Sequence, residues 1–337
     1  MVRCSSANTL DVTPHSLQAG ERPDVTVIVV NYNTGYLLDR MFRTLDNGRG
    51  SLRLQVIVVD NASRDNSVKI LREKYPDVEL IENATNVGFG RANNQALSLV
   101  RGRYVLLLNT DAFVSPDTLT KTTDFMDAHP QYGVLGVKLV GEDGALQPSC
   151  RYFPTPWNYF LTASGFDRFF PGARLVDDPG WDPASLRECD WVPGCYYLVR
   201  REVIERVGLF DIRYFLYYEE VDHCRAVRQA GWGVIYYPFT EVVHIGGESA
   251  LSDGQLSLAG RQISALQVES QLLYFRKHHG VGGVLSAVFL GAMTDLLKTC
   301  KALVQRRDGA RAAEAMRQVR MTLKVLVATR LASRATR

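Results

Sequence analysis

Short runs of apolar residues alternate with helix-like segments along the first third of this chain. The runs are bounded by polar turns and are apolar at consecutive positions rather than at every second one. This pattern is typical of parallel strands that are buried on both faces and joined by helices in βαβ units. The predicted strands are 25–30, 54–60, 78–82 and 104–111, and the predicted helices are 37–45, 67–75 and 91–100.

The pattern becomes mixed after a predicted helix N-terminus at 115–117. Residues 151–170 are aromatic, contain prolines and lack clear periodicity, which predicts a functional loop or lid. Their large aromatic side chains would make a sticky surface if exposed and would otherwise pack as core. The other predicted elements are a strand at 133–140 with a hairpin-like turn after it, a strand and then a helix within 190–208, a helix at 215–231, a short strand at 233–238, and helices within 260–278 and 281–333.

Charge is unevenly distributed along the chain. Residues 281–337 hold eleven Lys and Arg against three Asp and Glu, whereas the whole chain has a net charge of only +3. Residues 1–280 therefore carry a negative net charge, which disfavours nucleic-acid binding. A basic tail with apolar stretches suits either an anionic membrane surface or a solvated helix.

Neither secretion nor a clear membrane span is expected. The first residues contain no apolar run of signal-peptide length. The longest uncharged apolar stretch near the C-terminus, 281–294, is shorter than the ~20 residues that a span needs. The six cysteines form no CxxC pair, which favours reduced thiols in the cytosol and no structural zinc.

Polar side chains follow three of the predicted strands. Asn31 and Asn33 follow the first, Asp60 ends the second, and Asn109 and Asp111 close the fourth. Ligands of open α/β sheets bind at the carboxyl ends of such strands. No GxGxxG motif follows the first strand, so side chains rather than a glycine turn would hold a nucleotide. Asp60 equally suits a cap of the helix after it.

Two further features suit anions and cations. Asn86, Gly88 and Arg91 lie at the start of a predicted helix, where they favour an anionic group or form an ordinary strand-to-helix turn. Asp111 closes an unbroken apolar strand, where an unpaired carboxylate is costly to desolvate. A hard cation such as Mg²⁺ or Mn²⁺ would remove that cost, and capping of the next helix is the alternative.

Three carboxylates, Glu219, Glu220 and Asp222, cluster in the predicted helix 215–231. Crowded carboxylates repel one another, which raises the pKa of at least one and makes it a better base near neutral pH. A solvated helix face is the alternative interpretation. His244 ends an apolar segment and is either a metal ligand or a core histidine.

Taken in chain order, seven segments resemble the bacterial family 2 glycosyltransferases of GT-A fold, and within them the rhamnosyltransferase-like enzymes of cell-surface polysaccharide assembly. The segments are VTVIVVNYN, VIVVDNAS, NATNVGFGRANN, YVLLLNTD, WVPGCYYLVRREV, FLYYEEVDHCRAVRQAG and VVHIGGES. The resemblance implies a Rossmann-like, mostly parallel α/β sheet at 24–250, with a nucleotide-binding half at 24–115 and an acceptor half at 116–250. A flexible leader at 1–23 and a helical, membrane-associating tail at 251–337 complete the expected organisation.

The resemblance implies an inverting transfer of a hexose or deoxyhexose, with rhamnose favoured, from a dTDP- or UDP-sugar. The acceptor would be a polyprenyl-linked or other cell-surface glycan. The implied roles are nucleotide-sugar binding by Asn31, Asn33, Asp60, Asn86, Gly88, Arg91 and Asn109, a divalent cation (Mg²⁺ or Mn²⁺) on Asp111 and His244, and acceptor binding by Trp191, Gly194 and Tyr218. Asn109 stands where the family often has Asp.

The family usually has Glu-Asp where this chain has Glu219 and Glu220, so the resemblance places the general base at Glu220, with Asp222 as the alternative. Polyprenyl-linked acceptors reside in the membrane, so we expect a cytoplasmic protein that is peripheral on the inner face of the plasma membrane. Two other classes compete with this prediction. A nucleotidyltransferase that makes a sugar nucleotide would be expected to have a glycine-rich, basic loop after the first strand. A non-catalytic nucleotide-sugar-binding scaffold would not need the acidic cluster.

Overall fold

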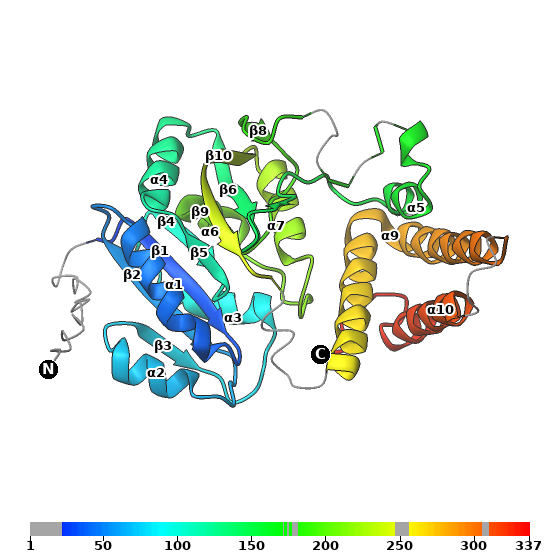
Figure 1. The fold of residues 1–337 in the computed structure, drawn as a ribbon, viewed down its shortest axis with the longest axis horizontal. Coiled ribbons are helices and arrows are strands. Elements are labelled where there is room, and N and C mark those ends of the chain that lie inside the picture. The colour runs from blue at the N-terminus through cyan, green and yellow to red at the C-terminus, as the bar shows by residue number, and fades with distance from the viewer. Residues whose placement is uncertain (1–21, 171, 174, 177–180, 247–255, 305–309) are drawn as a thin grey trace, which may run out of the picture.

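The computed structural model describes residues 22–170, 172–173, 175–176, 181–246, 256–304 and 310–337. Nearly all of the predicted leader at 1–23 lies outside the described residues, as does the start of the predicted tail. Figure 1 shows a sheet with helices on both faces, and a group of long helices beside it.

The first half of the chain forms the predicted βαβ units. Strands β1 (Val25–Asn31), β2 (Leu54–Asp60), β3 (Glu79–Glu82) and β4 (Tyr104–Leu108) pair in parallel, in the order β3-β2-β1-β4. The helices between them are α1 (Gly35–Gly48), α2 (Ser67–Lys74) and α3 (Phe89–Gln95), and a 3-10 turn at Ala96–Leu99 continues α3. The register pairs Asn31 with Asp60, so the polar residues that end β1 and β2 lie side by side.

The other half of the sheet is mixed rather than parallel. Strand β9 (Tyr196–Arg200) runs antiparallel between β4 and β6 (Tyr132–Val140), and β10 (Gly233–His244) runs parallel to β6. The short β5 (Ala112–Val114) and β8 (Arg187–Glu188) pair antiparallel with β10. Strand β7 (Leu146–Gln147) confirms the predicted hairpin after β6. The remaining helices of this part are α4 (Thr118–Ala128), α6 (Arg201–Val207) and α7 (Glu219–Gln229).

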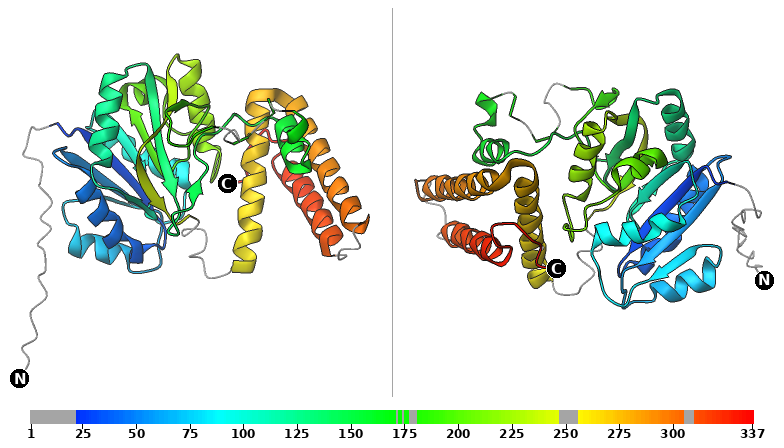
Figure 2. Two further views of the ribbon diagram at one scale, coloured as in Figure 1. Left: turned by 45° about the horizontal axis from the view of Figure 1, so that its top comes forward. Right: turned by 180° about the vertical axis from the view of Figure 1, so that it is seen from behind.

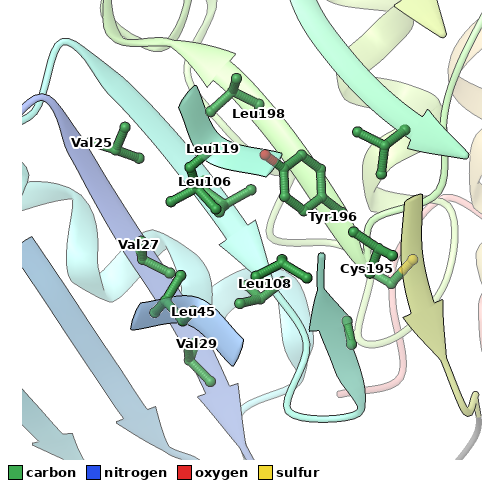
Figure 3. Close-up of a cluster of buried hydrophobic side chains, with 14 of the residues drawn as sticks. Val25, Val27, Val29, Leu45, Leu106, Leu108, Leu119, Cys195, Tyr196 and Leu198 are labelled. Atoms are coloured by element: carbon green, nitrogen blue, oxygen red, sulfur yellow. The ribbon is translucent and has the colours of Figure 1, made fainter. Parts of the chain in front are cut away.

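The central strands are buried on both faces because most of their residues are apolar. The buried polar residues Thr26 and Gln55 bond to each other, since Thr26 Oγ1 donates to Gln55 Oε1 (2.7 Å). Val27 of β1 packs in one core layer with Leu45 of α1 and Leu119 of α4, as Figure 3 shows. Ile28, the next residue of β1, belongs to the opposite layer together with Val203 of α6. Burial of this apolar area stabilises the sheet, and the sheet fixes the positions of the polar residues at its strand ends.

The prediction of an irregular loop at 151–170 is wrong for its middle part, which forms α5 (Pro156–Ser164). The side chain of Thr155 caps this helix by accepting a hydrogen bond from the Asn158 N–H (3.1 Å), and Gly165 ends it in the left-handed conformation. The aromatic side chains divide between core and surface, which hides the helical period. Phe160 is buried, Tyr159 is partly buried, and Trp157, Phe166, Phe169 and Phe170 are exposed.

The predicted C-terminal helices are α9 (Leu256–Val304) and α10 (Ala310–Ala328). Gly280 has a φ of +65°, which interrupts the helical backbone of α9 and turns its second limb away from the first, as Figure 2 shows. Helices α5, α9 and α10 pack together on the α7 side of the sheet. Residues 265–301 of α9 are long and apolar enough to cross a membrane by length and composition, the break at Gly280 divides them, and 17% of their apolar window is buried.

Candidate active site

The polar ends of β1 and β2 form a hydrogen-bonded cluster. Asn31 Nδ2 donates to Asp60 Oδ2 (2.8 Å) and to Ser63 Oγ (3.0 Å), and the Ser63 N–H donates to Asp60 Oδ1 (2.9 Å). Thr34 Oγ1 donates to Asn31 Oδ1 (2.8 Å) and lies 2.9 Å from Thr110 Oγ1. Asp60 therefore caps the turn after β2. Each of its carboxylate oxygens can still accept a further hydrogen bond from a ligand.

A glycine turn lies next to this cluster. Asn86 Oδ1 accepts hydrogen bonds from the Gly88 N–H (2.9 Å) and from Asn61 Nδ2 (2.8 Å). Gly88 has a φ of +89°, and an added Cβ would lie 2.5 Å from the Phe215 carbonyl oxygen. Only glycine fits that position. The turn thus holds the start of α3 against the segment that precedes α7.

Two of the predicted ligand-binding side chains are held by backbone groups. Arg91 Nε donates to the Ile212 carbonyl (2.9 Å), and its terminal nitrogen donates to the Arg337 carbonyl (2.7 Å). Asn33 has a left-handed backbone, and its Oδ1 accepts a hydrogen bond from the Arg64 N–H (2.6 Å). A ligand that uses either side chain has to compete with these bonds.

Asp111 and His244 face each other across β5 and β10, because the antiparallel register places His244 opposite Ala112. Asp111 Oδ1 lies 3.6 Å from His244 Nε2, and its Oδ2 accepts a hydrogen bond from the Gly246 N–H (3.1 Å). Gln147 Nε2 donates to the His244 carbonyl (2.8 Å), so Gln147 Oε1 is the atom 2.9 Å from His244 Nδ1. Because that oxygen only accepts, Nδ1 carries the proton and Nε2 presents its lone pair to the carboxylate.

These residues fit a divalent cation. Burial lowers the pKa of His244, which favours the neutral ring, and Asp111 is buried as well. A neutral imidazole nitrogen that faces a carboxylate oxygen offers two metal-donor atoms with no proton between them. Within the described part of the chain, no group of three or more His, Cys, Asp or Glu side chains surrounds a metal position. The remaining ligands would then come from substrate phosphates, as is usual for Mg²⁺.

Helix α7 begins at Glu219, four residues later than predicted. Tyr217 and Tyr218 have left-handed backbones, with φ of 71° and 74°, an uncommon conformation for residues other than glycine. Glu219 is buried, and its Oε1 has no hydrogen-bond partner among the described residues. Glu220 is only partly buried. Burial raises the pKa of both carboxylates, and the charge of Glu220 raises the pKa of Glu219 further.

Asp222 is occupied by contacts with α9. Its Oδ2 accepts a hydrogen bond from Lys277 Nζ (2.6 Å), and its Oδ1 lies 2.7 Å from His278 Nε2 and 3.3 Å from the Tyr214 hydroxyl. Lys277 also bonds Asp211 Oδ2 at 2.8 Å. Asp222 is 4% exposed. These bonds join α7 to the C-terminal helices, so Asp222 presents no free oxygen at the surface.

The loop that carries Asp111 is bonded to Cys195, which directly precedes β9. The Asn109 N–H donates a hydrogen bond to the Cys195 carbonyl (3.1 Å). Burial raises the pKa of the Cys195 thiol, and the charges of Asp111 and Glu220 raise it further. A Cβ added to Gly90 in α3 would lie 3.1 Å from Glu219 Cγ. Helix α3 therefore packs against the start of α7, while the Asp111 loop is bonded to the residue directly before β9.

Of the three predicted acceptor-binding residues, Trp191 and Gly194 precede β9 and Tyr218 directly precedes α7. Tyr218 is buried, and its hydroxyl lies 2.7 Å from that of Tyr159 in α5. Trp191 Nε1 donates to a backbone carbonyl (2.9 Å), and the Arg151 guanidinium lies 5.3 Å from the centre of its ring. A Cβ added to Gly194 would lie 4.0 Å from the ring of Phe89, an ordinary van der Waals contact.

The Glycosyl transferase family 2 model matches residues 26–170 of the chain. Residues 26–170 therefore resemble a family 2 glycosyltransferase domain. The match begins in β1, contains the Asn31, Asp60 and Asp111 regions, and ends beyond α5. The chain is therefore a transferase, as the sequence motifs imply.

Two curated rhamnosyltransferases are similar in sequence to this glycosyltransferase. It is 28% identical over 263 residues to the N-acetylglucosaminyl-diphospho-decaprenol L-rhamnosyltransferase of Mycobacterium tuberculosis, covering 71% of this chain and 81% of that protein. It is 25% identical to the rhamnosyltransferase WbbL of Escherichia coli, covering 65% of this chain and 83% of the relative. The predicted likeness to rhamnosyltransferases is thus confirmed.

A solved structure supports the GT-A-like fold. The mannosyltransferase PcManGT of Pyrobaculum calidifontis, in complex with GDP-Man and Mn²⁺, aligns with a TM-score of 0.52 at 20% identity. The alignment covers 94% of the glycosyltransferase and 89% of that chain. At this identity the comparison shows the fold alone.

Several residues of the glycosyltransferase site have no role in the sequence-based prediction. Ser63 lies three residues after Asp60, a spacing typical of side-chain capping, and this spacing could have indicated its contact. Gln147 and Arg151 carry no such local signal. Gln147 fixes the ring of His244, and the charge of Arg151 lowers the pKa of Glu220 while its own Nε is buried without a partner among the described residues.

Proposed function

We propose that this glycosyltransferase moves a hexose or deoxyhexose, with rhamnose favoured, from a dTDP- or UDP-sugar to a polyprenyl-linked or other cell-surface glycan, with inversion. The observation that carries the proposal is the buried Asp111–His244 donor pair, whose Oδ1 and Nε2 atoms lie 3.6 Å apart, together with a partly exposed Glu220 at the start of α7. The two rhamnosyltransferase relatives support the sugar, and the decaprenol in the name of one supports the lipid-linked acceptor.

The nucleotide would lie over the ends of β1 and β2. Asn31, Asn33 and Asp60 would contact the base and ribose through the acceptor and donor atoms that their internal bonds leave unused. The diphosphate would lie near Asn86, Gly88 and Asn109, where the N-terminus of α3 favours negative charge. Arg91 would have to exchange a carbonyl partner for a phosphate oxygen in order to contribute.

Asp111 and His244 would hold a divalent cation, Mg²⁺ or Mn²⁺, from the protein side. Bound there, the cation supplies positive charge that offsets the charge developing on the departing diphosphate. Asp111 contributes a buried carboxylate whose other oxygen is fixed by the Gly246 N–H. His244 contributes the Nε2 lone pair that Gln147 orients.

Glu220 would accept the proton of the acceptor hydroxyl as that oxygen attacks the sugar. Its raised pKa makes it a stronger base than an exposed glutamate, and its partial exposure lets an acceptor reach it. Glu219, which is buried beside it, would bind the substrate by a hydrogen bond, which its protonated carboxyl group could donate. Trp191, Gly194 and Tyr218 would line the acceptor side.

A thermal-shift screen of nucleoside diphosphate sugars, each with Mn²⁺ or Mg²⁺, tests this proposal, because a ligand that binds the folded state raises its apparent stability. We expect dTDP- or UDP-sugars to raise the melting temperature only when a divalent cation is present. Mixing the stabilising donor with a glycan acceptor should then release a nucleoside diphosphate. Release of pyrophosphate from a nucleoside triphosphate and a sugar phosphate would instead indicate a nucleotidyltransferase.

Replacing Gln147 with leucine is expected to weaken Mn²⁺ binding about 10- to 100-fold, because the partner that orients a ligating histidine contributes to metal affinity. Calorimetric titration of Mn²⁺ into the protein with saturating nucleoside diphosphate measures this effect. Gln131→Leu, at an exposed position, is the matched control. Equal Mn²⁺ affinity in the Gln147 variant and the control would remove the role of Gln147.

We also propose that the C-terminal helices attach the protein to the cytoplasmic face of the plasma membrane. Val281, Leu285, Phe289 and Leu296 are exposed apolar residues of α9 at spacings of four, four and seven, which places them along one helix face. Arg317, Arg320 and Lys324 of α10 are exposed as well. Exposed apolar residues next to basic ones suit an anionic bilayer surface.

Replacing Phe289 with aspartate is expected to reduce co-sedimentation with anionic vesicles by roughly tenfold or more, because burying a phenylalanine side chain contributes about 1.5–3 kcal/mol. Phe239→Asp, at an exposed position of β10 in the sheet, is the matched control. Vesicle binding that falls equally in both variants, or in neither, would contradict attachment through α9.

A further inference from the structure

A groove of about 270 Å³ lies between α5, α9 and α10, outside the candidate active site. Its volume is close to the lower end of small-molecule sites, roughly 300–1,000 Å³. Its walls are mainly apolar and include Tyr159, Phe160, Phe275, Ala287, Gly291 and Leu323. In Figure 2 these three helices stand together beside the sheet. We call this hollow the α5–α9–α10 groove.

The groove is connected to the acceptor side of the active site. Tyr159 lines it, and the Tyr159 hydroxyl lies 2.7 Å from the hydroxyl of Tyr218. Tyr218 is the left-handed residue directly before Glu219, at the start of the helix that carries Glu220. A molecule in the groove would therefore contact Tyr159, and the hydroxyl of Tyr159 is next to that of Tyr218, the residue directly before Glu219.

The groove also opens toward the proposed membrane surface. Gly291 and Leu323 line it and are exposed. Gly291 lies two residues after Phe289, and exposed apolar residues of α9 continue on both sides of it. Hydrocarbon could thus pass from a bilayer on α9 into the groove without crossing a charged surface of the sheet.

The chemistry of the walls favours hydrocarbon over a sugar or a nucleotide. Thr294 Oγ1 donates to the carbonyl of Leu290 within its own helix (2.9 Å), so this hydroxyl is already satisfied. The other polar residues of the described lining besides Tyr159 are Gln271, Asp295, Lys298, Gln318 and Thr322, and Lys298 is exposed. Most of the lining residues are apolar, so a phosphate or several sugar hydroxyls would be desolvated against a wall that offers them few partners. An unsaturated apolar chain has no such requirement.

We propose that the α5–α9–α10 groove binds a short stretch of the isoprenoid chain of the lipid-linked acceptor and thereby places its glycan beside Glu220. The inference rests on the proposed function, since it supplies a binding site for the lipid part of that acceptor. The groove takes only a few isoprene units, and the rest of the chain stays in the bilayer. Recognition of the lipid is then separate from recognition of the donor.

Gly291→Leu tests the proposal because it fills the groove without an evident cost to folding. A Cβ added at Gly291 meets no described residue within 4 Å, and leucine favours a helix more than glycine does. Gly282→Leu is the matched control, since Gly282 is also in α9, has no described neighbour within 4 Å of an added Cβ, and is not among the described residues of the groove lining. Both variants add the same apolar side chain to the same helix.

With an acceptor that carries a long polyprenyl tail, Gly291→Leu is expected to raise KM at least tenfold and to leave kcat unchanged. The KM for an acceptor with the same glycan on a short, water-soluble alkyl tail should stay unchanged in both variants. Gly282→Leu should match the wild type with both acceptors. An unchanged KM for the polyprenyl acceptor in Gly291→Leu would overturn the proposal, as would an equal rise in Gly282→Leu.

Photo-crosslinking separates this inference from the proposed function because it needs no turnover. A benzophenone-tagged prenyl diphosphate should label peptides of α5, α9 or α10 in the full chain, and Gly291→Leu should lose the label. Unlabelled polyprenyl phosphate should compete for labelling, whereas phosphatidylglycerol should not. Equal competition by phosphatidylglycerol would overturn the proposal in favour of a general lipid site. If the wild-type protein binds no nucleoside diphosphate sugar but is still labelled, the proposed function is refuted and the groove remains a prenyl-binding site.

Discussion

Replacing Asp111 with asparagine is expected to lower sugar transfer by at least about 10²–10³-fold at every concentration of Mg²⁺ or Mn²⁺. Asparagine has nearly the same shape and keeps an acceptor for the Gly246 N–H, but it lacks the charge that holds a cation. Removal of one group that stabilises the negative charge developing in a transition state lowers the rate by a factor of this size. Initial rates of nucleoside diphosphate release, measured across a metal titration, give the result.

The matched control for this variant is Asp143→Asn. Asp143 lies in the exposed turn between β6 and β7, where its Oδ1 accepts a hydrogen bond from the Ala145 N–H, and asparagine can replace it in that contact. The control should transfer sugar like the wild type, and both variants should melt like it. Full metal-dependent transfer by Asp111→Asn would exclude Asp111 from cation binding.

Replacing Glu220 with glutamine is expected to lower kcat by about 10²-fold or more and to change donor affinity little, since a general base contributes about 10²–10⁴-fold. Glu220→Asp keeps a carboxylate and should recover part of the lost rate. In the wild type the base form must be unprotonated, so kcat should rise with pH through the pKa of Glu220, which burial raises above its ordinary value. The glutamine variant should lose that rise.

Asp222→Asn distinguishes the two candidate bases. Asp222 is buried and bonded to Lys277 and His278, so its replacement by asparagine weakens charge-assisted hydrogen bonds, which contribute about 1.5–3 kcal/mol each. Lys277 keeps its bond to Asp211. We expect a lower melting temperature and a kcat that still rises with pH. A stable Asp222 variant without that pH dependence, together with an active Glu220→Gln, would move the base to Asp222.

Local patterns predict most of the first half of the sheet. The apolar runs of β1 and β2 bury both faces, so their boundaries and polar ends follow from short stretches of sequence. Strand β4 is predicted as well, but it ends at Leu108, three residues before the predicted end. The placement of Asn31 beside Asp60 follows from parallel pairing alone. Helix α5 is missed because its aromatic residues are divided between core and surface, although Thr155, Pro156 and Gly165 mark its ends.

Contacts between distant residues are not visible in such patterns. Gln147 and His244 are 97 positions apart, and Asp222 meets α9 through residues 55 and 56 positions later. Nothing in the spacing of either pair announces the contact, because the sheet register and the packing of α9 bring them together. The acidic cluster was therefore recognisable from the sequence, but the different surroundings of Glu220 and Asp222 were not.

Calorimetric titration of dTDP and UDP into the full chain, with and without Mn²⁺, tests the proposed cation site most directly. We expect binding in the presence of Mn²⁺, an affinity at least tenfold lower without it, and the same weak affinity for Asp111→Asn whether or not Mn²⁺ is added. Nucleotide affinity that does not depend on Mn²⁺ in the wild type would contradict a diphosphate held through a cation on Asp111 and His244.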